Sequence, residues 1–139
     1  MTKYPFIPVN IPLVNGNEKK YLNECIDTGW ISSEGPFVNQ FEDQFASRVQ
    51  RNFAVAVSSG TAALDVAVEA LRIGSGDEVI IPAFTIISCI GQVIRSGATP
   101  VLVDCDPLTW NMDINQVEEK ITENTKAIMV VHIFGLPVD

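Results

Sequence analysis

The stretch that decides the fold reads Phe53-Ala54-Val55-Ala56-Val57-Ser58-Ser59-Gly60-Thr61-Ala62-Ala63-Leu64. Residues 53–57 form a short apolar run typical of a strand, and residues 61–73 have the composition of a helix. Ser59, Gly60 and Thr61 lie at the corner between them. The first amide N–H groups of a helix have no partner within it and carry the positive end of its dipole, so a phosphate can bind there.

The same corner has a second interpretation. Ser and Thr are common helix caps, so the side chain of Ser59 or Thr61 could serve the helix alone. Gly60 fits a phosphate site because a residue without Cβ lets the backbone approach an anion closely and tolerates a positive φ. The corner therefore predicts either a phosphate cup or a helix cap.

Apolar periodicity predicts further elements on both sides of this corner. One helix is expected over 18–28, ended by Gly29, and another over 85–96. A third is expected to begin at Pro36 and to carry on one face Phe37, Phe41, Phe45 and Val49. A fourth is expected to follow an Asp113 cap, with inward-facing Ile114, Val117 and Ile121. Strands are expected over 78–81, 100–103 and 127–131. Strands alternating with helices predict an α/β fold with a mostly parallel sheet and helices on both of its faces.

Composition sets limits on the function. The chain has 139 residues, 47% of them hydrophobic, which is typical of a globular domain. The formal net charge of -8 predicts no nucleic-acid partner and no anionic membrane surface as a partner. Without a long apolar run or a signal-like N-terminus, we expect a cytoplasmic protein. The three cysteines are expected to be reduced, buried thiols rather than disulfides or metal ligands.

Four segments follow predicted strands: residues 58–61, 82–86, 104–106 and 132–135. Ligands of parallel sheets collect at the carboxyl ends of the strands, so we expect these segments to converge on one edge. His132, the single histidine, lies in the last of them. A histidine without an identified partner defines no mechanism, and we expect a hydrogen-bonded structural role.

Asp104-Cys105-Asp106 is a second candidate motif. Two carboxylates at this spacing can share a hard cation, as in metal-dependent glycosyltransferases that hold a nucleotide-sugar diphosphate. Aspartate is also a common way to open a turn or to cap a helix, and we expect that role here, with no metal bound. Near the N-terminus, Trp30 with Ser32 and Ser33 could form a polar and aromatic ligand edge, or Trp30 could fill the core.

Four motifs in order resemble the DegT/DnrJ/StrS sugar aminotransferases along essentially the whole chain. They are Ser59-Gly60-Thr61-Ala62-Ala63-Leu64, the segment 76–85 beginning Gly76-Asp77-Glu78, the segment 97–104 beginning Gly97-Ala98-Thr99, and His132-Ile133-Phe134-Gly135-Leu136-Pro137. Residues 23–27, 30–33 and Gly35 are most similar to the perosamine synthase branch of that family.

The resemblance implies a fold-type-I large domain of a pyridoxal 5'-phosphate enzyme, a homodimer, and an amino transfer from an amino-acid donor to a nucleotide-linked 4-keto-6-deoxy sugar. It implies that Ser59, Gly60 and Thr61 hold the cofactor phosphate and that Ile86 covers the pyridine ring, where relatives carry an aromatic residue. Phe84 would point elsewhere if its segment is extended. Trp30, Ser32 and Ser33 would border the sugar pocket.

The resemblance also implies a longer protein. Residues 1–35 would be an N-terminal segment with a helix, and residues 36–139 the first part of the cofactor-binding domain. The lysine that forms the Schiff base and the acid that pairs with the pyridine nitrogen have no counterpart here, since none of Lys3, Lys19, Lys20, Lys120 and Lys126 stands in a matching context. We expect an N-terminal fragment that is inactive alone. A truncated, non-catalytic domain that binds a partner chain is the remaining alternative.

Overall fold

A computed structural model describes residues 5–8 and 10–139, so Lys3 lies outside the described residues. The chain divides into two compact units, residues 1–56 and residues 57–139. Among the described residues, no helix combines the length and the apolar character that crossing a membrane requires.

The described part of the first unit contains two helices, α1 (Glu18–Thr28) and α2 (Pro36–Arg48). Both helices confirm the elements that the apolar periodicity predicted. Helix α1 ends at Gly29, which adopts the left-handed conformation with φ 74°, and α2 begins with proline in its first turn. The rings of Tyr21 and Phe37 lie 5.2 Å apart between their centroids, which joins the two helices.

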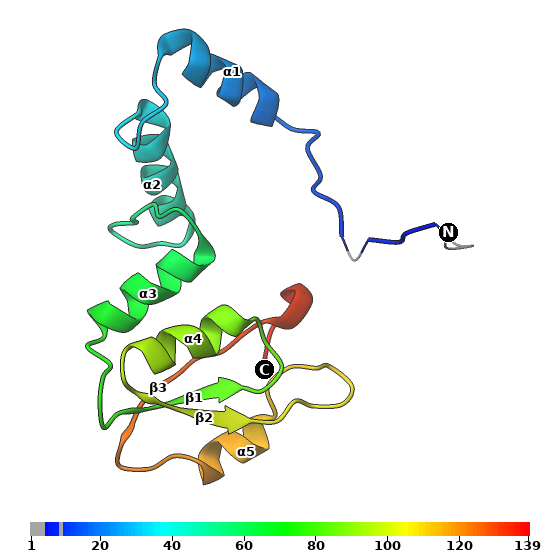
Figure 1. Cartoon of the computed structure of the whole chain (residues 1–139), viewed down its shortest axis with the longest axis vertical. Helices are drawn as coiled ribbons and strands as arrows, with labels where there is room; N and C mark the ends of the chain where they lie inside the picture. The colour runs from blue at the N-terminus through cyan, green and yellow to red at the C-terminus, as the bar shows by residue number, and fades with distance from the viewer. Residues whose placement is uncertain (1–4, 9) are drawn as a thin grey trace. The chain divides into compact units, whose positions relative to one another are not determined.

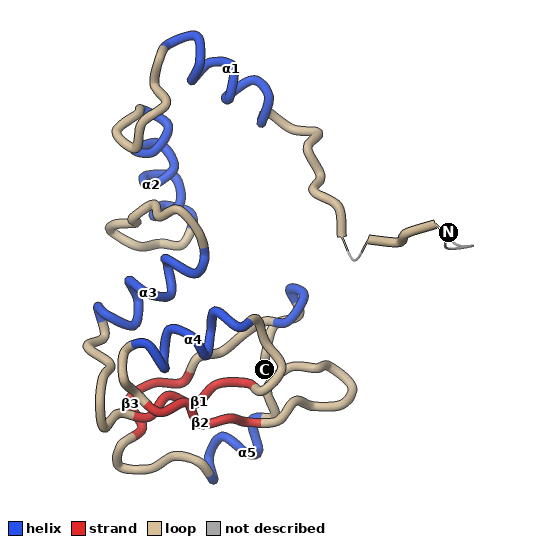
Figure 2. The backbone as a smooth tube through the Cα atoms, in the orientation of Figure 1, coloured by secondary structure: helices blue, strands red, loops and turns tan. Residues whose placement is uncertain are grey.

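The second unit is a three-stranded parallel sheet with helices (Figure 1). Its elements are α3 (Gly60–Ala70), β1 (Glu78–Pro82), α4 (Ile87–Arg95), β2 (Thr99–Val103), α5 (Ile114–Glu119), β3 (Thr125–Ile128) and the short 3-10 turn η1 (Ile133–Gly135). The strand order is β2-β1-β3, so β1 is central (Figure 2). Glu78 is in register with Thr99 on one side and with Thr125 on the other.

The two faces of the sheet bury alternate residues of β1. Val79 and Ile81 pack into a cluster with Val68 of α3 and Val93 of α4. Ile80 packs on the opposite face with Val103, and Val117 of α5 lies against that cluster. Helices α4 and α5 accordingly cover opposite faces (Figure 1). This confirms the predicted α/β sheet covered on both sides.

One predicted strand does not form. Residues 53–57 have no ladder partner, and the side chains of Phe53 and Val55 are 88% and 74% exposed. A strand is stabilised by a neighbour, and the sheet of the second unit consists of β1, β2 and β3. The prediction of a strand at 53–57 was therefore wrong for the described chain.

Smaller differences have local causes. Helix α3 ends at Ala70 instead of residue 73, and α4 begins at Ile87 because Ile86 is extended. Strand β3 ends at Ile128, although the amide of Met129 still donates to the carbonyl of Ile80. Ile114 and Ile121 are half-exposed, so α5 is less buried than its pattern predicted. All three cysteines are free, as predicted, but only Cys89 is buried and Cys25 and Cys105 are half-buried.

Candidate functional site

Ser59 is the N-cap of α3. Its backbone is extended, with φ −165° and ψ 165°, and its Oγ accepts a hydrogen bond from the amide of Ala62 at 3.2 Å. The backbone oxygen of Ser59 accepts from the amide of Ala63. The capping interpretation is therefore confirmed for Ser59. Its hydroxyl proton is not used by this contact, because the oxygen acts as the acceptor.

Gly60 and Thr61 begin the helix with open space in front of them. A Cβ built on Gly60 would meet nothing within 4 Å, and Gly60 is not among the described glycines with positive φ. The expected need for a left-handed backbone is therefore not found. The remaining reason for a glycine at this position is that an anion can approach its backbone closely. No hydrogen bond of the described residues uses the amide N–H of Gly60 or of Thr61, as expected in a first helical turn.

Thr61 makes a contact that local sequence did not reveal. Its Oγ1 lies 2.8 Å from the Oγ of Ser88, the second residue of α4. Because α4 follows the carboxyl end of β1, this contact places the first turn of α3 at that edge of the sheet. The sequence analysis missed Ser88, and its hydroxyl two positions after Ile86 is the one signal that could have found it.

Two further contacts bring the other post-strand segments to the same edge. The rings of Phe84, after β1, and Trp110, after β2, have centroids 5.3 Å apart. The Oδ1 of Asn111 accepts from the amide of Ile133, which follows β3, at 3.1 Å. Each of these contacts joins a predicted segment to a residue just beyond another one, namely Ser88, Trp110 and Asn111, so that the predicted convergence is supported through neighbouring residues. Phe84 also packs against Trp110 while Ile86, the N-cap of α4, is 65% exposed, so the two side chains have different surroundings.

His132 has the structural role that we expected. Its Nδ1 accepts a hydrogen bond from the amide of Val138 at 3.0 Å, which closes the turn after β3. An imidazole nitrogen that accepts a backbone proton is not free to act as a base at that atom.

Asp106 organises the loop after β2. Its Oδ1 accepts from the amides of Thr109 and Leu108 and from the Thr109 hydroxyl, at 2.8 to 3.0 Å. These donors, the Thr109 amide first, lower the pKa of Asp106 below its ordinary value. The Oδ1 of Asp104 accepts from the amide of Cys105. Both carboxylates serve the turn, and across residues 5–8 and 10–139 no three His, Cys, Asp or Glu side chains form a metal-binding group.

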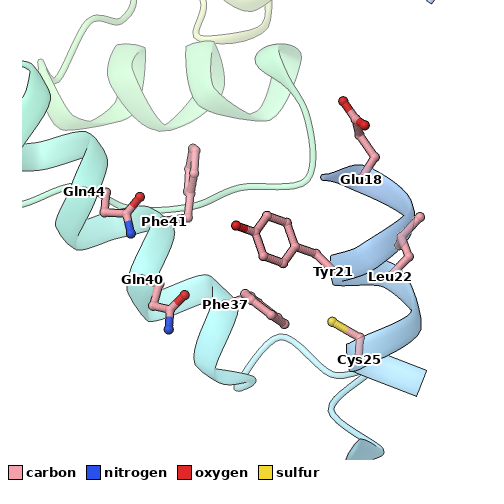
Figure 3. A pocket seen from close by; sticks show the side chains of 8 residues that line it. All are labelled: Glu18, Tyr21, Leu22, Cys25, Phe37, Gln40, Phe41 and Gln44. Carbon is pink, nitrogen blue, oxygen red and sulfur yellow. The ribbon is translucent and has the colours of Figure 1, made fainter. Parts of the chain in front are cut away.

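Trp30 and Ser32 lie in the first unit. They line a hollow of about 330 Å³ together with Gly35 and residues of α1 and α2, whereas Ser33 is not among its lining residues. Trp30 is half-exposed, so it does not fill a core. A second hollow of about 530 Å³ lies between the helices, with Tyr21, Phe37 and Phe41 pointing into it (Figure 3). Both hollows are mostly apolar.

Residues 12–139 match the sequence family described as "DegT/DnrJ/EryC1/StrS aminotransferase family". A curated relative, the GDP-perosamine synthase of Escherichia coli O157:H7, is 48% identical over 134 residues, which are 96% of this chain and 37% of the relative. The chain thus spans little more than a third of the length of that relative.

Two solved structures resemble the chain in three dimensions over nearly all of its length. Spr1654 from Streptococcus pneumoniae, in its PLP form, has a TM-score of 0.86 at 35% identity and is matched over 96% of this chain and 34% of its own. The E. coli GDP-4-keto-6-deoxy-D-mannose-3-dehydratase with bound hydrated PLP has a TM-score of 0.82 at 32% identity, over 92% of this chain and 34% of its own.

Proposed function

The chain belongs to the DegT/DnrJ/EryC1/StrS aminotransferase family, and from this membership we propose that the complete protein is a pyridoxal-phosphate-dependent aminotransferase of nucleotide-linked 4-keto-6-deoxy sugars. Its fold is part of the fold-type-I large domain of such enzymes. The 48% identity to a GDP-perosamine synthase supports a GDP-linked substrate. An amino acid is the proposed amino donor and a homodimer the proposed assembly.

The observation that carries this proposal is the donor set at the first turn of α3. The hydroxyls of Ser59 and Thr61 and the amides of Gly60 and Thr61 are neighbouring donors at the start of α3, and a Cβ on Gly60 would meet nothing within 4 Å. A phosphate group needs several hydrogen-bond donors and tolerates no crowding by a Cβ, so these residues fit it. We propose that they hold the cofactor phosphate.

When bound, pyridoxal phosphate supplies a carbonyl carbon that takes up the amino group and an electron sink for the charge left by a departing proton. The chain supplies the position. The phosphate would be fixed by the α3 turn, and the exposed Ile86 side chain would lie over the ring. We propose that Trp30, Ser32 and Ser33 border the sugar, and that residues 1–35 precede a large domain beginning at residue 36.

The test uses the complete protein with pyridoxal phosphate, ¹⁵N-glutamate and GDP-4-keto-6-deoxy-D-mannose. We expect a GDP-linked amino sugar that carries ¹⁵N, identified by mass spectrometry. A product that has lost water without gaining ¹⁵N would overturn the aminotransferase and indicate a dehydratase reaction. A dTDP-linked keto sugar, tested in parallel, shows whether the enzyme uses a GDP-linked or a dTDP-linked substrate.

The glycosyltransferase alternative has less support. The Oδ1 of Asp106 accepts from three donors within its own turn, which is the arrangement of an aspartate that opens a turn. This arrangement favours the turn-forming interpretation of the Asp104-Cys105-Asp106 motif.

A further inference from the structure

The contact between Thr61 and Ser88 joins the first turns of two helices. Thr61 is the second residue of α3 and Ser88 the second residue of α4, and their hydroxyl oxygens lie 2.8 Å apart. Such a distance is that of a normal O–H···O hydrogen bond. Either oxygen can be the donor, because each hydroxyl has one proton and can also accept.

The count of protons limits what the pair can do. One of the two hydroxyl protons lies within the pair, and the other is available to a further acceptor. If Thr61 donates to Ser88, its own proton is used and Thr61 has none for an anion. If Ser88 donates to Thr61, the Thr61 proton is free to point outward. A hydrogen bond from the Thr61 hydroxyl to an anion at the α3 turn therefore requires Ser88 to be the donor of the pair.

The surroundings of Ser88 agree with this direction. Ile86, the N-cap of α4, gives that helix no side-chain cap, so the first turn of α4 is open next to the pair. Two positive helix ends thus lie beside the Thr61 hydroxyl, and both favour a negative group in front of it. In a chain of hydrogen bonds each member strengthens the next, so a proton donated by Ser88 makes Thr61 a better donor.

We propose that Ser88 is a positioning residue for the cofactor phosphate: it donates to Thr61 and thereby fixes the Thr61 hydroxyl as a donor to the anion. This inference rests on the proposed function, because it needs the phosphate at the α3 turn. Ser88 itself does not contact the phosphate in this proposal, and it acts entirely through Thr61.

The experiment measures dissociation constants in the complete protein for pyridoxal phosphate and for pyridoxal, which lacks the phosphate. The variants are Ser88→Ala, Thr61→Val and the double variant. Ser96→Ala is the matched control, because it removes a serine hydroxyl from the other end of α4, where Ser96 donates to the Val93 carbonyl. We expect Ser88→Ala to weaken pyridoxal phosphate binding about three- to tenfold. The affinity of Ser88→Ala for pyridoxal, and the affinity of Ser96→Ala for pyridoxal phosphate, should each stay within about twofold of the unchanged protein.

The double variant gives the decisive comparison. If Ser88 acts through Thr61, the double variant binds pyridoxal phosphate no more weakly than Thr61→Val alone. Additive losses, or equal losses for pyridoxal phosphate and pyridoxal, would overturn the role of Ser88 and leave the phosphate site standing. If Thr61→Val itself leaves the affinity for pyridoxal phosphate unchanged, the proposed site at α3 is wrong and the inference falls with it.

Discussion

Asn111 holds Ile133 through a hydrogen bond between the Asn111 Oδ1 and the Ile133 amide, at 3.1 Å. The Nδ2 of the same side chain donates to the carbonyls of Leu136 and Pro137. Asn111 is only 5% exposed. One buried amide thus ties the loop after β2 to the segment after β3, and its full set of partners explains why a polar residue is buried there.

The first prediction concerns this amide. Asn111→Ala leaves the amide of Ile133 and two carbonyls without their partner, so we expect the complete protein to lose about 2–4 kcal/mol of unfolding free energy. Urea denaturation followed by circular dichroism measures it. Asn124→Ala is the control, because Asn124 is exposed. Equal losses in the two variants would contradict the role of Asn111.

The second prediction separates the turn from the metal site at Asp106. Asp106→Asn keeps the Oδ1 acceptor that Leu108 and Thr109 use, so turnover should stay within about twofold of the unchanged protein. If Asp106 were a metal ligand, turnover would collapse and recover as Mg²⁺ or Mn²⁺ is raised. Such a metal-dependent recovery would overturn the aminotransferase assignment.

A third prediction follows from the lowered pKa of Asp106. A carboxyl whose pKa is lower in the folded protein contributes stability above its unfolded pKa, near 4, and that contribution is lost as the pH falls through the folded pKa. The difference in stability between the unchanged protein and Asp106→Asn should therefore be constant near neutral pH and should shrink below about pH 4. Denaturation at a series of pH values checks this, and a difference that grows on acidification would contradict it.

The fourth prediction concerns the ring-covering position. Ile86→Phe provides the stacking that an aliphatic residue lacks, so pyridoxal phosphate should bind about two- to tenfold more tightly in the complete protein. Its neighbour Ile87 is 78% exposed and serves as the control, as Ile87→Phe. Titration of the cofactor absorbance measures both, and the same affinity in both variants would show that Ile86 does not lie over the ring.

The fifth prediction tests the 139-residue chain alone. We propose that none of the lysines in these 139 residues forms the Schiff base, so borohydride reduction in the presence of pyridoxal phosphate should modify no lysine stoichiometrically. Lys120 is already engaged, since its Nζ donates to the Leu102 carbonyl. Peptide mapping locates any label. Stoichiometric labelling of a single lysine would contradict the interpretation of the chain as lacking its covalent anchor.

The helices and the core strands could be predicted because their signals are local. Gly29 ends α1, Pro36 opens α2 and Asp113 caps α5, each within a turn of the residues it serves. The apolar run at 53–57 carried the same kind of signal and failed, because a strand also needs a partner that its own sequence does not contain.

Part of the candidate site could also be predicted from local signals. Ser59, Gly60 and Thr61 are adjacent, so their place at a helix start was readable. Ser88 was missed because its partner is 27 positions away and the packing of α3 on α4 decides their contact. The placement of Trp30, Ser32 and Ser33 beside a substrate stays a prediction.

The central position of β1 has a consequence for the order of folding. Its pairing with β2 spans only α4 and two short connections, whereas its pairing with β3 also spans β2, the 104–112 loop and α5. Closing the longer loop costs more chain entropy, and contacts between distant residues form late. We expect the β1-α4-β2 segment to form the nucleus, with β3 joining last and its amide hydrogens exchanging with solvent before those of β1.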